Sequence, residues 1–153
     1  MLLRYRLSLG FFIFALVASG ITTFPLRWEL TTLDGSLPIS GFSHWIEFVH
    51  SGIDDIHARF PFFFYATDWL GFGHFVIAAF FILPFFDPPK YRAVLKVGLA
   101  ACIGVIIVAF VCGAIRGIPL GWRLIDCSFG VIGAIPLLYC LRLTSQLVQN
   151  PNR

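Results

Sequence analysis

Long stretches without a charged side chain dominate the pattern of hydrophobic and polar positions along this chain. A helix needs about 20 apolar residues to cross the hydrocarbon layer of a bilayer. Stretches near that length lie at about 7–26, 68–86, 93–115 and 119–141. Pro88 and Pro89 end the second stretch, and Pro136 is expected to bend the fourth. The pattern predicts an all-α fold, a transmembrane bundle of four helices in a single integral membrane domain over residues 1–153.

The first stretch has a second interpretation. Arg4 and Arg6 precede a short apolar core, and Ala18, Ser19 and Gly20 follow that core, which is also the pattern of a secretory signal peptide. Because the run is long enough to span, we expect an uncleaved first helix.

Composition supports lipid as the main surrounding. Hydrophobic residues make up 58% of the chain and charged residues 12%, about half the charged fraction of a typical soluble domain. The net charge of +3 is scattered, without a block of Lys and Arg, and gives no support to nucleic-acid binding.

The basic residues predict the orientation, since Lys and Arg concentrate in cytoplasmic loops. With the N-terminus inside, the cytoplasmic side carries most of them: Arg4, Arg6, Lys90, Arg92, Lys96, Arg142 and Arg153. The outer side then carries Arg27, Arg59, Arg116 and Arg123. The distribution predicts a multi-pass protein with both termini in the cytoplasm.

Residues 27–67 form the one sizeable segment between spans, and the orientation places it outside. Apolar positions recur there at steps of four and three, at Phe42, Ile46, Val49, Ile53, Ile56 and Phe60. That spacing predicts an extracytoplasmic amphipathic helix, lying on the membrane surface or capping the bundle.

Beside this apolar face runs a polar stripe of Glu47, His50, Asp54 and His57. Two His and two carboxylates suit zinc or iron, so the stripe is a candidate metal site. Two alternatives stay open. One is a solvated face with pairs such as His50–Asp54 and Asp54–His57, and the other is a contact with a partner protein.

Ionisable residues within spans are costly and mark candidate functional positions. The predicted topology brings five of them to one depth near the outer surface: Asp68, His74, Arg116, Arg123 and Asp126. We expect Arg123 and Asp126 to pair, since they are three residues apart. On the helical wheel Gly71, His74 and Ala78 share one side, which we expect to face other helices.

Four interpretations of this outer cluster remain open. It is a structural network of ion pairs and hydrogen bonds, a site for an anionic or polar headgroup that uses the two Arg, or a catalytic site for proton transfer with His74 and an Asp. His74 is also a candidate ligand of a haem or pigment cofactor.

Small residues predict close helix packing. Ala100 and Gly104 are four residues apart in the third span, as are Gly130 and Ala134 in the fourth. This spacing lets helix backbones approach one another.

Two segments carry a resemblance: Asp68-Trp69-Leu70-Gly71-Phe72-Gly73-His74-Phe75 and Trp122-Arg123-Leu124-Ile125-Asp126. They are similar to small bacterial membrane proteins and, more distantly, to the VanZ-like family, which is implicated in glycopeptide resistance. The residues that match its pattern are Asp68, His74, Phe75, Arg123, Asp126, Gly130 and Gly133. Here Trp69 replaces the usual Lys after the Asp, the Asp-to-His spacing is longer, and the expected Asn before the late Gly is absent. The resemblance implies a bacterial inner membrane and brings no defined reaction.

The sequence thus favours a non-enzymatic integral membrane protein, in contact with lipid and with other membrane subunits as an accessory part of a complex. An enzyme or headgroup-binding protein that uses the outer cluster is the first alternative, and a metal-binding outer helix is the second.

Overall fold

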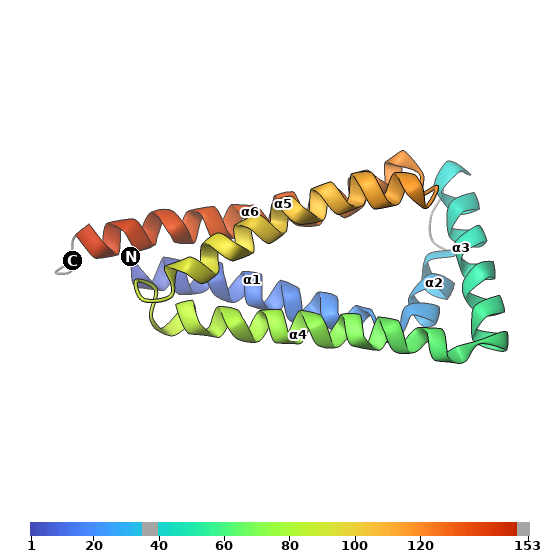
Figure 1. The fold of residues 1–153 in the computed structure, drawn as a ribbon, viewed down its shortest axis with the longest axis horizontal. Coiled ribbons are helices and arrows are strands. Elements are labelled where there is room, and N and C mark those ends of the chain that lie inside the picture. Colours follow the sequence, from blue (N-terminus) through green and yellow to red (C-terminus); the bar gives the residue numbers. More distant parts are fainter. Residues whose placement is uncertain (35–39, 150–153) are drawn as a thin grey trace. The chain divides into compact units, whose positions relative to one another are not determined.

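The computed structural model describes residues 1–34 and 40–149, and nearly all of them are helical. The elements, in chain order, are α1 (Leu2–Thr22), α2 (Leu26–Asp34), α3 (Ser40–Arg59), a short 3-10 helix (Pro61–Phe64), α4 (Tyr65–Phe86), α5 (Arg92–Ile115) and α6 (Leu120–Gln149) (Figure 1). No strand occurs in the described part of the chain, and the predicted all-α fold is confirmed.

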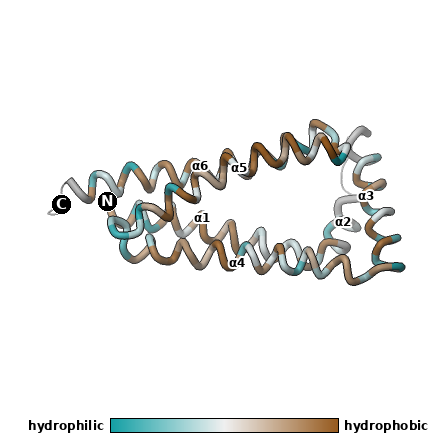
Figure 2. Tube along the Cα trace, viewed as in Figure 1, coloured by the Kyte–Doolittle hydropathy of each residue, from teal (hydrophilic) through white to brown (hydrophobic). Residues whose placement is uncertain are grey.

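Four segments are long and apolar enough to cross a membrane: Leu2–Thr22, Pro61–Phe86, Arg92–Ile115 and Leu120–Leu147. Figure 2 shows hydrophobic residues predominating along most of α5, whereas hydrophilic residues gather at the turn that precedes it. The chain is therefore a multi-pass membrane protein, as the charge-free stretches predicted.

The helix ends differ from the predicted spans. The first helix begins at Leu2 and ends at Thr22, because Pro25 interrupts the chain and a separate helix, α2, follows it. The last helix continues beyond Arg142 to Gln149. Hydropathy marks the part of a helix that lies in hydrocarbon, while the backbone hydrogen bonds of a helix also extend into water.

The chain forms two compact units. One comprises residues 1–15 and 78–153, and the other comprises residues 16–77. The first unit is a bundle of the first part of α1, the last part of α4, and all of α5 and α6. The second unit holds α2, α3, the rest of α1 and the first part of α4.

Close packing of α5 against α6 organises the first unit, where the two helices lie side by side (Figure 1). A Cβ atom on Gly130 would lie 2.5 Å from the backbone oxygen of Cys102, so the absent side chain lets the two backbones approach. Gly98 and Gly113 are also buried on α5. The predicted packing position Gly130 is confirmed.

The predicted packing pair on α5 does not pack within the described part of this chain, where that prediction is wrong. Ala100 is exposed, and nothing lies within 4 Å of a Cβ built on Gly104. Gly104 and Gly113 are nine residues apart, which places them on opposite sides of the helix. The side of α5 that packs on α6 carries Gly98, Cys102, Ala109 and Gly113 instead.

The buried Tyr5 joins α1 to the end of α4. Its hydroxyl donates a hydrogen bond of 2.8 Å to the carbonyl of Pro84. Within a helix this carbonyl would accept from the backbone nitrogen four residues later, but that residue is Pro88, which has no N–H. Tyr5 thus satisfies a carbonyl that the prolines leave without a donor, and Phe12 packs edge-on against Phe81 nearby in the same unit.

In the second unit, α1 and α4 cross at two glycines. A Cβ on Gly71 would lie 2.9 Å from the backbone oxygen of Gly20 and would overlap the hydroxyl of Thr23. Phe24 stacks on Phe75 beside this crossing, with ring centroids 6.2 Å apart. The predicted packing side of Gly71 and His74 is confirmed, since a Cβ on Gly20 would lie 3.0 Å from that of His74.

The predicted amphipathic helix corresponds to α3. Ile46 on its apolar face is buried, with 1% exposure, and Val49 and Ile53 are partly buried. Further along, Ile56 and Phe60 are exposed. The apolar face is therefore covered within the chain only in part.

Candidate functional site

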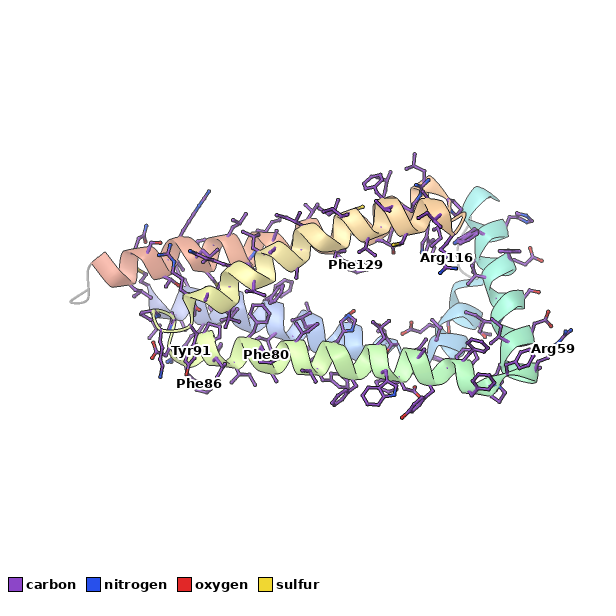
Figure 3. The ribbon with its side chains drawn as sticks, in the orientation of Figure 1. Arg59, Phe80, Phe86, Tyr91, Arg116 and Phe129 are labelled. Carbon is purple, nitrogen blue, oxygen red and sulfur yellow. The ribbon has the colours of Figure 1, made fainter. Side chains whose placement is uncertain are left out.

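The turn between α5 and α6 fixes the position of Arg116. Gly117 has a φ of +69°, a conformation that favours glycine. Its N–H donates to Ala114 O at 3.2 Å, and the N–H of Ile118 donates to Gly113 O at 2.9 Å. These two bonds form a Schellman motif, so the turn ends α5 and leaves the exposed Arg116 at its C-terminus (Figure 3).

Arg123 lies at the same end of the hairpin, in the first turns of α6. Its Cγ and Cδ atoms pack over Gly113 of α5, 2.8 and 2.6 Å from where a Cβ would stand. Its Nε is buried and has no hydrogen-bond partner among the described atoms. A buried donor without a partner costs about 1–3 kcal/mol, so this nitrogen is a position where an acceptor would stabilise the protein.

The predicted ion pair between Arg123 and Asp126 does not form, although the structure describes both residues. The Arg123 side chain turns toward α5, where it covers Gly113, instead of running along α6. Asp126 is partly buried on the next turn. Arg116, Arg123 and Asp126 thus share one end of the hairpin without the ion-pair network that we had considered for them.

Asp68 and His74 belong to the second unit and lie on different sides of α4. Six residues place them about 120° apart around the helix. His74 is partly buried, and its Nδ1 lies 2.8 Å from Leu70 O, so the ring donates to that carbonyl. Asp68 is exposed, and no hydrogen bond to His74 occurs in the described part of the chain. A proton-transfer pair of these two residues therefore does not form.

The five residues of the predicted outer cluster fall in two units: Asp68 and His74 belong to the second unit, and Arg116, Arg123 and Asp126 belong to the first. Their gathering at one site stays a prediction.

No family model, curated protein or solved structure matches this chain. The VanZ-like resemblance stays a prediction that rests on the residues named for it.

The polar stripe of α3 does not form a ligand set. Among the described residues, no group of three or more His, Cys, Asp or Glu side chains is placed to hold a metal ion. His50 Nε2 lies 3.5 Å from Asp54 Oδ2, a pairing that the sequence predicted. His57 packs edge-on against Phe64, with ring centroids 5.3 Å apart. Glu47 and His57 are ten residues apart on one helix, about 15 Å, too far to share an ion.

The described part of the structure does not bring Glu47, His50, Asp54 and His57 together around one ion; whether the stripe binds metal at all stays a prediction, which elemental analysis of the purified protein tests directly. The cofactor hypothesis for His74 also stays a prediction. A ligating His usually donates its other ring N–H to a carbonyl or carboxylate, and the bond to Leu70 O fits this arrangement.

The structure adds three residues that the sequence analysis missed. Tyr65, Trp69 and Phe72 lie with Asp68 on one side of α4, and together these four residues line a shallow, open hollow of about 220 Å³, hereafter the aromatic hollow. Their spacing of three, four and seven residues along a helix could have indicated it.

Proposed function

We propose that this protein is a non-enzymatic subunit of a membrane complex, in the bacterial inner membrane with both termini in the cytoplasm. The observation that carries the proposal is the uncovered small-residue face of α5. Ala100 is exposed, and the side of Gly104 is open, although their spacing suits close approach of another helix. This face lies opposite the one that packs on α6, so a partner helix can bind it without displacing α6.

The extent of uncovered apolar surface supports the same proposal. In each candidate span, between 22% and 28% of an apolar 18-residue window is buried within the chain. Exposed side chains on the first unit include Phe80 of α4 and Phe129 of α6 (Figure 3). Lipid covers such surface in an isolated protein, and helices of other subunits cover part of it in a complex.

Replacing Gly104 with leucine tests the proposal. No described atom lies within 4 Å of a Cβ built on Gly104, and this side of α5 is open, so the unfolding transition of the purified protein should not change. It should block a close helix contact and reduce recovery of partner subunits, or of a second copy, by about tenfold or more, since each 1.4 kcal/mol is a factor of ten. The measurement is quantitative mass spectrometry after native purification from membranes.

Val105→Leu is the matched control, because Val105 is exposed on another side of α5 and leucine there leaves the small-residue face open. Recovery of a monomer without partners from the unmodified protein, under mild extraction, would contradict the subunit role. So would equal partner recovery in the Gly104→Leu and Val105→Leu proteins.

A second candidate function is binding of an anionic lipid headgroup at the outer end of the α5–α6 hairpin. It is supported by the partnerless Nε of Arg123 and by the nearby Arg116. Guanidinium groups bind phosphate oxygens well because they offer several donors in one plane. The VanZ-like resemblance and a catalytic use of His74 with Asp126 remain further hypotheses, without a reaction assigned.

We expect Arg123→Gln to lower the amount of phosphatidylglycerol that stays bound through purification by about fivefold to tenfold, from the loss of one charge-assisted contact. Lipid extraction and mass spectrometry measure it. Arg59→Gln is the control, because Arg59 is an exposed arginine at the end of α3 (Figure 3). Equal retention in both variants would exclude a specific site at Arg123.

A further inference from the structure

The aromatic hollow combines a carboxylate with three aromatic rings on one side of α4. Trp69 is 56% exposed, Tyr65 62% and Phe72 53%, so the three rings are open to the surroundings. The carboxylate of Asp68 is exposed among them. All four residues belong to the same unit of the structure.

The rings are arranged at steep angles to one another. Trp69 stands at 84° to Tyr65, with centroids 5.9 Å apart, and at 87° to Phe72, with centroids 5.7 Å apart. Rings at these angles present aromatic faces in more than one direction along this side of α4. The face of each ring carries partial negative charge, which attracts cations.

The position of the hollow relative to the membrane follows from the charge-free part of α4. No charged residue occurs between Asp68 and Asp87. At about 1.5 Å per residue, this stretch approaches the roughly 30 Å thickness of the hydrocarbon layer. Asp68 therefore lies near one boundary of that layer, at the level of lipid headgroups, where Trp and Tyr are enriched.

We propose that the aromatic hollow binds the ammonium group of a zwitterionic lipid, phosphatidylethanolamine or phosphatidylcholine. The Asp68 carboxylate neutralises the cation, and the faces of the aromatic rings contact its methyl or methylene groups, as aromatic cages do for quaternary ammonium ligands. An aromatic belt alone explains Tyr65 and Trp69 at this depth. It does not explain an exposed carboxylate that shares the hollow with them.

This site does not depend on the subunit role proposed for the face of α5. It differs also from the anionic site proposed at Arg123, since it recognises the opposite charge of the headgroup.

Native mass spectrometry of the full chain in detergent, titrated with single lipids of matched acyl chains, tests the proposal. Trp69→Leu should weaken binding of phosphatidylcholine and phosphatidylethanolamine by about threefold to thirtyfold, the range for a partly desolvated cation–π contact. Asp68→Asn should weaken it by up to about fivefold, the range for an exposed ion pair. Binding of phosphatidylglycerol, which lacks an ammonium group, should stay unchanged in both variants.

Two matched controls separate the site from general effects. Asp55→Asn removes an exposed carboxylate on α3, and Trp28→Leu removes an exposed indole on α2. Neither residue lines the hollow, and neither variant should alter lipid binding. Circular dichroism of each protein verifies that its helical content is retained.

A parallel titration tests whether the hollow binds a lipid headgroup or a soluble cation. It compares tetramethylammonium chloride with sodium chloride at the same ionic strength. We expect competition only at millimolar concentrations, because the soluble cation lacks the acyl chains that hold a lipid headgroup at this depth. Tight binding of the soluble cation without binding of either zwitterionic lipid would overturn the lipid assignment. Equal loss of all three lipids in Asp68→Asn, or no loss at all, would overturn the site.

Discussion

Replacing Gly71 with alanine should destabilise the protein by about 1–3 kcal/mol, the cost of overpacking a close contact. The added methyl group would overlap the hydroxyl of Thr23 and lie 2.9 Å from the backbone oxygen of Gly20 and 2.7 Å from the ring of Phe24. A side chain can rotate away, but the backbone oxygen moves only if α1 and α4 separate. Equilibrium unfolding in mixed detergent and SDS micelles, followed by circular dichroism, measures the change.

Gly73→Ala is the control on the same helix. Nothing lies within 4 Å of a Cβ at Gly73, and alanine favours a helix by up to about 1 kcal/mol relative to glycine. Its stability should therefore stay equal or rise. A loss of stability in Gly73→Ala as large as that in Gly71→Ala would show that the effect does not come from the helix crossing.

Replacing Gly130 with alanine should have an effect of similar size on the first unit, again about 1–3 kcal/mol. Its methyl group would lie 2.5 Å from Cys102 O and 3.1 Å from the side chain of Ile106. Because Cys102 O belongs to the backbone of α5, relief requires the two longest helices of the unit to move apart. The same unfolding measurement applies.

The control for this contact is Gly104→Ala, on the open side of α5. The structure predicts unchanged or slightly increased stability there. If Gly130→Ala were tolerated and Gly104→Ala were not, the packing side of α5 would be the one that its sequence first indicated.

The difference between Gly104 and Gly113 shows how far the sequence could predict the fold. In water, the polar side of a helix marks the surface and the apolar side marks the core. In lipid, both sides of a spanning helix are apolar, so periodicity does not tell which one packs. Charge-free length therefore located the spans, whereas the packing side of α5 required the structure.

The candidate site shows the same limit in other terms. The six-residue spacing of Asp68 and His74 already put them about 120° apart on one helix, but only the structure shows the bond from His74 to Leu70 O. Spacing also suggested that Arg123 would pair with Asp126. The long, flexible Arg side chain packs over Gly113 instead, a contact with a residue from another helix that local spacing cannot reveal.

The carbonyl of Pro84, unsatisfied within its helix, was open to prediction from the sequence and was missed. Pro88 follows Pro84 by four residues, so the Pro84 carbonyl has no intrahelical donor and is open to a donor from elsewhere in the chain or from water. Tyr5 supplies that donor. Its distance in sequence, however, gave no reason to choose it over the other hydroxyl groups of the chain.

The bond from Tyr5 to Pro84 also bears on how the protein is made. A ribosome delivers the chain from its N-terminus, so Tyr5 enters the membrane long before Pro84 has been synthesised. Cys140, whose thiol contacts the Tyr5 carbonyl at 3.7 Å, emerges later still. In contrast, α5 and α6 are adjacent in sequence and can associate as soon as both have been inserted. Helix α1, which is translated before α4 and α6, is thus among the last of these helices to acquire its final neighbours, and it depends on lipid or insertion machinery in the interval.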